Sequence, residues 1–416
     1  MRKARLAFAA AAGALGTVKV GNAAVEEAVS IKDPIGLNKQ TIRVERGLIK
    51  EVHTNWYPAN NPIEDTHDMR LRLRKSPGSL FGVFDGHSGT AASGFCRDDL
   101  FNILEFKHQK ALANKRRTKE ATEPPLLNPP VFKEADDAFL QVALAERRFI
   151  DGNAGACAVV CHLAGTNLTT AWAGDCRAIL GKKPFLHSIL GGGLTADELT
   201  LDHQIDSNPA EKHRLVTEHP NEPDVLYRNR VKGRLEPTRA FGDGKYKMME
   251  YFNFYPRLTQ RYSQSGWTPP YVTAVPDVSH RTINSSTEFL VLACDGLFQD
   301  LTSQEVVESV GEYLQAAKEQ KTDHNAASWL TEKALRASAS KYTRTGSLDE
   351  LLALPQGRER RRRHDDITIQ VIFFDHNSTY PKQTPSGGRI SEPAILSTHR
   401  RLPKDALGPP GAISKL

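Results

Sequence analysis

Apolar runs that meet an aspartate at one end recur along the chain, and they constrain its fold more than any other feature. Short apolar runs bounded by glycine and polar residues are typical of buried β-strands. The runs lie at residues 80–84, 168–173, 289–294 and 367–374, and the aspartates beside them are Asp85, Asp175, Asp295 and Asp365. Several strands are therefore expected to carry a carboxylate at one end.

The first of these runs continues as Asp85-Gly86-His87. Taken alone, this stretch is explained by an ordinary Asp-Gly turn after a strand, but the recurrence of the pattern favours a shared site. Carboxylates that converge at strand ends repel one another unless cations lie between them. Ligands that are all oxygen atoms favour a hard ion such as Mg²⁺ or Mn²⁺, and His87 can carry a proton near neutral pH.

The charge of the chain is concentrated at its two ends. The 416 residues carry a formal net charge of +6, of which residues 1–20 contribute +4 and residues 376–416 another +4. The part between them is therefore slightly acidic, at −2. A body of this charge is not typical of a nucleic-acid binder, so we expect no nucleic-acid partner. Its length is sufficient for a large core.

The amino-terminal stretch 1–20 is basic, rich in alanine and free of acidic residues, which is typical of a mitochondrial targeting helix. Its apolar part is too short to span a bilayer comfortably. A secretory signal is the alternative, but the five scattered cysteines indicate a reducing compartment. We expect a targeting and linker segment at 1–39, one large domain at 40–375 and, because of its composition, a disordered tail at 376–416. Membrane anchoring is left open.

Three segments are assigned from composition alone. Residues 107–130 are basic and then rich in proline, and we expect a loop or insertion there. Residues 245–270 carry seven aromatic side chains, which would suit either a lid or docking surface or an ordinary covering insertion. The basic run 358–363 could attract phosphate, but a solvated loop is favoured.

Seven short motifs follow one another in an order that resembles the metal-dependent protein serine/threonine phosphatases of type 2C. They are IED (63–65), GVFDGHSG (82–89), AGDCRAIL (173–180), LTLDH (199–203) to EHP (218–220), TRAFGD (238–243), LVLACDGLFQDLTSQEVV (290–307) and HDDITIQVI (364–372). The resemblance spans residues 40–375. It implies a catalytic domain of α+β class, an α/β/β/α sandwich of two antiparallel sheets flanked by helices, with a metal site at one end.

The resemblance also implies roles for residues at the motif positions. Two Mg²⁺ or Mn²⁺ ions would activate a water that hydrolyses phosphoserine or phosphothreonine. Asp65 would act through water with Glu64 beside it, and Asp175 would help to bind a weaker third ion. His87 is placed to protonate the leaving oxygen. The expected ligands of the two ions are Asp85, the carbonyl of Gly86, Asp295 and Asp365.

The chain departs from the family pattern near the Glu-Asp pair. Many members carry an arginine a few residues earlier that binds the substrate phosphate, whereas this chain has none there. We expect Asn55 to replace it. Asp366 stands where many relatives have asparagine. Arg239 and Asp243 are expected to shape the rim of the site without a direct chemical role.

Within the family, the chain is most similar to the mitochondrial pyruvate dehydrogenase phosphatases, through ANNPIEDT, EHPNEPDV, RAFGDGKYK, TPPYVTAVPDV and VGEYL. This similarity implies a phosphoprotein substrate, with the pyruvate dehydrogenase complex as a candidate partner, and a mitochondrial location. The alternatives are a type 2C phosphatase with another substrate and a catalytically weak relative that only binds phosphoproteins. The presence of Asp85, His87, Asp295 and Asp365 favours an active enzyme.

Overall fold

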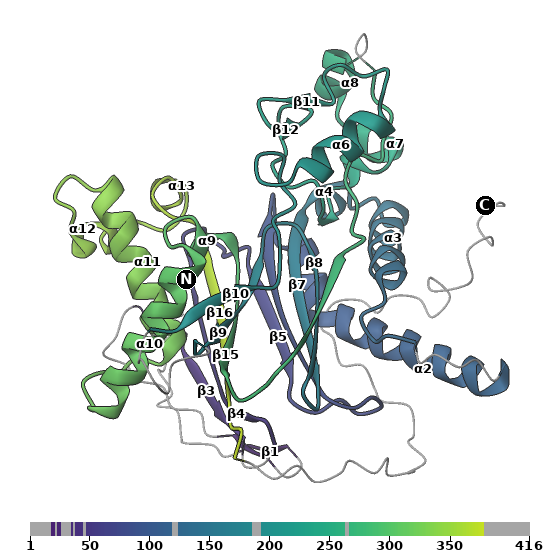
Figure 1. The fold of residues 1–416 in the computed structure, drawn as a ribbon. Coiled ribbons are helices and arrows are strands. Elements are labelled where there is room, and N and C mark those ends of the chain that lie inside the picture. Colours follow the sequence, from purple (N-terminus) through teal and green to yellow (C-terminus); the bar gives the residue numbers. More distant parts are fainter. Residues whose placement is uncertain are drawn as a thin grey trace, which may run out of the picture.

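Two antiparallel β-sheets pack face to face in the centre of the molecule, and helices cover the outer face of each sheet (Figure 1). The computed structural model describes residues 18–20, 23–25, 35, 38–44, 47–118, 124–184, 193–262 and 266–377. Its layers follow the order helix, sheet, sheet, helix. The α+β sandwich that the sequence motifs implied is therefore confirmed.

The first sheet has the strand order β10-β9-β15-β16-β4-β3, and each neighbouring pair is antiparallel. All eight residues of its central strand β16 are buried, because side chains cover this strand on both faces. The strands of this sheet are β3 (Gln40–Arg43), β4 (Ile49–Tyr57), β9 (Arg177–Lys182), β10 (Thr195–Glu198), β15 (Thr287–Ala293) and β16 (Ile367–Phe374).

The second sheet has the strand order β14-β8-β7-β6-β5, with the short strand β13 paired to β7. Successive side chains of a strand point to opposite faces, and β6 shows the consequence. Phe81 and Val83 pack between the two sheets, whereas Leu80 and Phe84 pack under the outer helices. The strands are β5 (Thr66–Arg70), β6 (Ser79–His87), β7 (Gly155–Ala164), β8 (Asn167–Ala173), β13 (Phe241–Gly242) and β14 (Asp277–Thr282).

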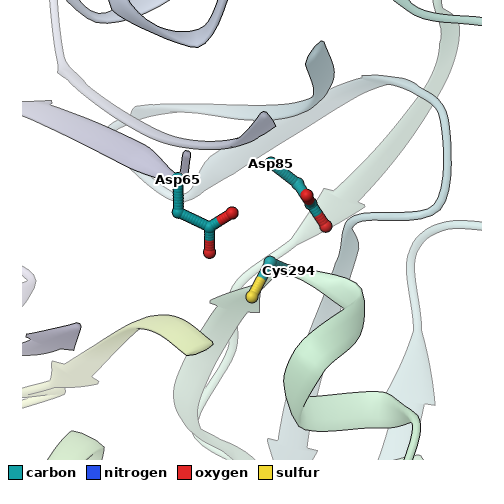
Figure 2. A group of neighbouring side chains, drawn as sticks. All are labelled: Asp65, Asp85 and Cys294. Carbon is teal, nitrogen blue, oxygen red and sulfur yellow. The ribbon is translucent and has the colours of Figure 1, made fainter. Parts of the chain in front are cut away.

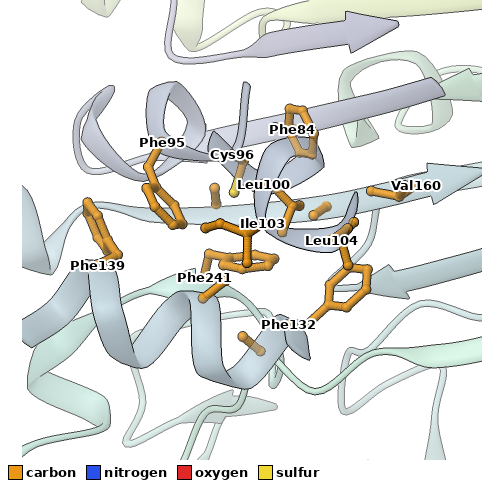
Figure 3. Packing of buried hydrophobic residues seen from close by; sticks show 14 of the residues in the cluster. Phe84, Phe95, Cys96, Leu100, Ile103, Leu104, Phe132, Phe139, Val160 and Phe241 are labelled. Carbon is orange, nitrogen blue, oxygen red and sulfur yellow. The ribbon is translucent and has the colours of Figure 1, made fainter. Parts of the chain in front are cut away.

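The outer helices cover the sheets with separate apolar cores. Over the first sheet, Val306, Val310 and Leu330 are fully buried, and the first helix there begins with a capping box formed by Thr302 and Glu305. Over the second sheet, aromatic side chains interlock between the helices and the strands (Figure 3). The covering helices are α1 (Ala91–Phe95), η1 (Cys96–Leu100), α2 (Phe101–Thr118), α3 (Pro129–Ala145), α4 (Phe149–Asn153), α10 (Ser303–Lys318), α11 (Ala326–Tyr342) and α12 (Leu348–Leu352).

Most of the segment 205–272 forms an insertion beyond one end of the sandwich with its own core, while its strand β13 pairs with β7 in the second sheet. Four of its aromatic side chains, Tyr246, Phe252, Trp267 and Tyr271, are buried against one another. The structure thus favours the covering insertion over a surface of exposed aromatic side chains. Its elements are α6 (Pro209–Glu218), β11 (Leu226–Tyr227), β12 (Arg230–Val231), η2 (Gly244–Tyr246), α7 (Met249–Asn253) and α8 (Pro256–Tyr262).

Two predictions made from composition are wrong. Residues 107–118 belong to helix α2 and not to a loop, because Ile103, Leu104 and His108 bury one side of the helix while its basic last turn faces solvent. The basic run contains helix α13 (Arg358–Arg361). Its Arg360 is buried and donates to the carbonyl oxygens of Leu352 and Leu354, at 3.0 and 2.5 Å.

The expected ends of the chain lie largely outside the described residues. The structure does not describe residues 1–17 of the expected targeting segment or residues 378–416 of the expected tail. Two short strands, β1 (Val18–Val20) and β2 (Ala23–Val25), pair with each other. In the ranges that the structure covers, no helix combines the length and the apolar character needed to cross a bilayer.

Candidate active site

Carboxylates from both sheets meet at one end of the sandwich. Asp65 lies just before β5 and Asp85 near the end of β6, in the second sheet; Asp295 follows β15 and Asp365 precedes β16, in the first. The side-chain oxygens of Asp65 and Asp85 and the sulfur of Cys294 lie within 4.8 Å of one another (Figure 2). The backbone N–H of Asp295 lies 3.4 Å from Oδ2 of Asp85.

Side-chain amides donate hydrogen bonds to the other acidic groups near this cluster. Gln299, in the first turn after helix α9 (Asp295–Phe298), donates from Nε2 to Oδ2 of Asp295 at 2.7 Å and to Oδ2 of Asp365 at 3.5 Å. Asp175, in the turn between β8 and β9, accepts from Nε2 of Gln204 at 2.7 Å. The structure therefore brings Asp65, Asp85, Asp295 and Asp365 together, with Asp175 close enough to act on Asp85 electrostatically.

Burial and the charge of neighbouring carboxylates raise the pKa values of four of these carboxyls, those of Asp65, Asp85, Asp175 and Asp365. Burial raises the pKa of Asp365 to about 8, and the charge of Asp295 adds to the rise. Burial likewise raises the pKa of Asp65 to about 7, with the charge of Asp366 as the second cause, and that of Asp175 to about 6. For Asp85, burial and then the charge of Asp65 raise the pKa well above its usual range.

The oxygen atoms of the cluster fit a divalent cation. Within the residues that the structure describes, Oδ2 of Asp65 and Oδ1 of Asp295 are buried and lack a hydrogen-bond partner, and buried unpaired oxygens of this kind are costly. A hard cation prefers such oxygens to sulfur. The Cys294 sulfur is already engaged, because it accepts from the N–H of Thr368 at 3.1 Å and donates to the carbonyl of Asp366 at 3.3 Å.

Two glycines allow the backbones around the cluster to approach closely. A Cβ at Gly86 would collide with the carbonyl oxygen of Glu64, and one at Gly296 would collide with that of Asp366. The end of β6 therefore packs directly on the segment that carries Asp65, and the turn after β15 packs on the segment that carries Asp365. Only glycine permits this spacing, which sets how closely the carboxylates within each sheet approach.

Asp366 holds the Asp65 segment in place. Its carboxylate accepts hydrogen bonds from the backbone N–H groups of Ala59, Asn60 and Glu64, at 2.7, 2.8 and 2.9 Å, and from the Asn60 side chain at 3.0 Å. Glu64 in turn accepts from the N–H of Gly89 at 2.6 Å. Asp366 is thus an anchor that joins β16 to the segment 59–65.

His87 is held by Asp243, a partner that the sequence did not reveal. Nε2 of His87 lies 2.8 Å from Oδ2 of Asp243, whose side chain is only 1% exposed. Burial lowers the pKa of His87, but the charge and the hydrogen bond of Asp243 outweigh it and raise the pKa above its usual value. Asp243 was expected only to shape the rim; the structure shows that it orients the imidazole. Nδ1 of the ring contacts no hydrogen-bonding group among the residues described.

Two arginines differ in their relation to the cluster. Arg239 bridges Glu211 and Asp277, at 2.7 and 2.8 Å, and so fastens the loop that carries Asp243, as expected of a rim residue. Arg361 of α13 lies 2.5 Å from Oδ2 of Asp365. Gln299 was not expected at the site, and Arg361 was considered only as part of the basic run 358–363. Each lies four residues from an acidic site residue, and this helical spacing was the available signal.

Asn55 does not lie where a substrate phosphate could reach it. Its side chain is completely buried between β4 and α11, and Nδ2 donates to Oγ1 of Thr331 at 2.9 Å and to the carbonyl of Ile35 at 3.3 Å. The neighbouring Trp56 faces the other way and packs on His67 of the second sheet. Strand alternation therefore turns Asn55 towards the helices and away from the acidic cluster.

Comparisons with known proteins agree with this architecture. A family model described as "Protein phosphatase 2C" matches residues 59–343. A protein phosphatase 2C homologue of Schizosaccharomyces pombe is 30% identical, with 82% of this chain and 84% of the relative covered. The mitochondrial [pyruvate dehydrogenase [acetyl-transferring]]-phosphatase 1 of Bos taurus is 29% identical, with 77% of each covered. A crystal structure of serine-threonine phosphatase 2C from Toxoplasma gondii has a TM-score of 0.51 at 21% identity, covering 80% of this chain and 99% of that one.

Cation binding to the cluster should release protons. Because the pKa values of Asp175, Asp65 and Asp365 are raised to about 6, 7 and 8, the metal-free site keeps protons at neutral pH that a cation must displace. Affinity for Mn²⁺ should therefore rise as the pH rises through this window. Titration calorimetry in buffers of different ionisation enthalpy measures the protons released.

The same raised pKa values fix the sign of the effect on stability. The stability that the protonated carboxyls contribute is complete below the unfolded pKa, near 4, and is lost as the pH rises through about 6 to 8. The melting temperature of the metal-free protein should fall over this range, and Mn²⁺ should restore it. Heats of binding that do not depend on the buffer would contradict the assignment, and Asp365→Asn should reduce the number of protons released.

Proposed function

Because the chain belongs to the protein phosphatase 2C family, and is thus a metal-dependent protein serine/threonine phosphatase, we propose that its substrate is the phosphorylated pyruvate dehydrogenase complex. The similarity to the bovine and human mitochondrial pyruvate dehydrogenase phosphatases supports this substrate. The motifs shared with that branch are distributed between residues 59 and 314, and the first of them contains Asp65. The alternative is a different phosphoprotein, acted on by the same site.

The acidic cluster is the observation on which the assignment of site residues rests. In our proposal, two Mg²⁺ or Mn²⁺ ions are held by Asp85, the carbonyl of Gly86, Asp295 and Asp365, with Asp65 acting through water. Asp175 would contribute to a third, weaker site. When bound, such ions activate water and neutralise charge on the phosphoryl oxygens. The unpaired buried oxygens of Asp65 and Asp295 support the assignment.

The chain's own residues supply the proton and the alignment. His87 hydrogen bonds Asp243 through Nε2, so the imidazolium can donate its Nδ1 proton to the serine or threonine oxygen as that oxygen leaves phosphorus. Asp243 stabilises the imidazolium and fixes the plane of the ring. Asp366 and Glu64 hold the segment with Asp65 against the end of β6 and the turn that follows it.

Hydrolysis should depend on a divalent cation and on the acidic cluster. We expect the purified chain to dephosphorylate phosphorylated pyruvate dehydrogenase with Mg²⁺ or Mn²⁺ and to lose this activity in EDTA. Asp295→Asn should lower kcat strongly while the circular dichroism spectrum stays unchanged, because the charge at the site is reduced. Release of inorganic phosphate is the measurement.

An unrelated phosphoserine peptide serves as the comparison substrate. Equal kcat/KM values on the peptide and on pyruvate dehydrogenase would remove the substrate assignment and leave a general type 2C phosphatase. Full activity in chelator would contradict the metal site itself. Binding of phosphoproteins without turnover under any metal condition would indicate the catalytically weak relative.

Replacing His87 tests its role as the acid. An alkoxide is a poor leaving group, so its protonation should accelerate hydrolysis by about 10²- to 10⁴-fold, whereas a nitrophenolate hardly needs a proton. His87→Gln should therefore slow phosphoserine hydrolysis far more than hydrolysis of p-nitrophenyl phosphate. Steady-state kinetics on both substrates measure the difference, and equal losses would assign His87 to orienting the site instead.

We further propose a mitochondrial location. The similar pyruvate dehydrogenase phosphatases of Bos taurus and Homo sapiens are mitochondrial proteins, and residues 1–20 of this chain are basic and free of acidic residues. A fluorescent reporter fused after residue 40 should colocalise with a mitochondrial dye. A variant with its four basic residues at positions 2, 3, 5 and 19 changed to glutamine should not. A diffuse signal from the unchanged fusion would contradict the location.

A further inference from the structure

A cavity of about 710 Å³ lies between the turn after His87 and the insertion. Its wall includes Ser88, the residue after His87, and Lys245, which lies two residues beyond Asp243. From there it extends to Tyr255 and Arg257, at the start of helix α8 in the insertion. A space of this size has room for amino-acid side chains, so it adjoins the site where the phosphate would be removed.

The cavity is lined by positive charge without counter-charge. Arg234, Lys245 and Arg257 all contribute to its wall, and none of its lining residues is acidic. Within the described ranges, no carboxylate forms an ion pair with any of the three. Other arginines of the insertion behave differently: Arg230 pairs with Glu236 at 2.5 Å, and Arg239 pairs with Glu211. The cationic lining is thus a local feature of this cavity.

The charges in the wall act on one another. Burial lowers the pKa of Lys245, and the like charge of Arg234 lowers it further, while Asp243 opposes both effects. Asp243 is already engaged by His87. An anion in the cavity would relieve the repulsion between Lys245 and Arg234, which no carboxylate in the wall does.

Neutral groups complete a built wall. Asn153 is only 4% exposed; its Oδ1 accepts from the N–H of Lys245 at 2.7 Å, and its Nδ2 donates to the hydroxyl of Tyr255 at 3.1 Å. The Tyr255 oxygen thereby acts as an acceptor, which directs its own proton to another partner. Ser88 adds an exposed hydroxyl. Ile150 and Pro256 make part of the wall apolar. The charged groups on it are all cationic, and an anion would be their complement.

We propose that this cavity binds an anionic side chain of the phosphoprotein substrate, a carboxylate or a second phosphate, close in sequence to the residue being dephosphorylated. One extended residue spans ~3.3 Å, and the cavity wall includes Ser88, the neighbour of His87, so we place the anion within about three residues of the phosphoserine. The inference rests on the proposed function, because it presumes that phosphate is removed at the acidic cluster.

Matched phosphoserine peptides test the inference. Each peptide carries glutamate, a non-hydrolysable phosphonate analogue of phosphoserine, or glutamine at one of the first three positions on either side of the phosphoserine. For at least one position, kcat/KM with Mn²⁺ should be about tenfold higher for an anionic peptide than for its glutamine counterpart. The glutamate and phosphonate arms distinguish a carboxylate from a second phosphate.

Substitutions then locate the preference. Arg257→Gln and Arg234→Gln should reduce the ratio of anionic to neutral kcat/KM, mainly through KM, and Arg257→Glu should favour a peptide with lysine at the same position. Arg261→Gln, one turn further along α8 and outside the cavity wall, is the matched control and should keep the ratio. In the unmodified chain, raising NaCl from about 0.05 M to about 0.5 M should also reduce it.

Binding without turnover separates this inference from the proposed function. Fluorescence anisotropy of the same peptides in EDTA should show tighter binding of the anionic forms whether or not any peptide is hydrolysed. Preferential binding in EDTA, together with no hydrolysis of any peptide in Mn²⁺, would contradict the proposed function and support the cavity. Equal binding and equal kcat/KM for anionic and neutral peptides, or a preference unaffected by Arg234 and Arg257, would overturn the inference and leave the phosphatase assignment intact.

Discussion

Repulsion between buried carboxylates is the constraint on which the rest of this structure depends. Two of the aspartates come from one sheet and two from the other, so the site exists only when the sheets are stacked in register. At an effective dielectric of about 20, two unit charges 4 Å apart repel by about 4 kcal/mol. The metal-free molecule relieves this by keeping protons on Asp65 and Asp365, whose pKa values are raised to about 7 and 8. Three apolar cores, one between the sheets and one under each helical layer, hold the strands together against this repulsion.

The adjacent residues Asp365 and Asp366 show how one sequence motif supplies two different functions. Asp366 accepts four hydrogen bonds from the segment 59–64 and is therefore fully engaged in positioning backbone. Asp365 faces Asp295, Gln299 and Arg361, which leaves it beside the other acidic groups of the site. A strand begins directly after the pair, and alternation sends the two carboxylates to opposite sides. Asp366 thus fixes the position of Asp65 relative to strand β16, which Asp365 precedes.

Much of the fold and part of the site could be predicted from the sequence. Apolar runs beside aspartates predicted strands β6, β8, β15 and β16, because buried strands consist largely of apolar residues. The order of the motifs predicted the sandwich. The orientation of Asn55 left no such trace: a register shift of one residue decides whether it faces the site or helix α11. The partnership of His87 with Asp243 spans 156 residues, and it depends on a left-handed backbone at Asp243, where φ is 53°. The loop predicted at residues 107–118 was also wrong, since a basic amino-acid composition occurs both in exposed helices and in loops.

The insertion buries its own aromatic core, separate from the cores that stack the two sheets. Loops on its outer side can therefore change in length or charge without disturbing the spacing of the aspartates at the strand ends. On our proposal, substrate selection depends on the cavity at α8, whereas the aspartates lie at the strand ends, so the two could change separately in evolution. Exchange of the α8 region alone would then redirect the enzyme to other phosphoproteins, provided that the loop with Asp243 is kept.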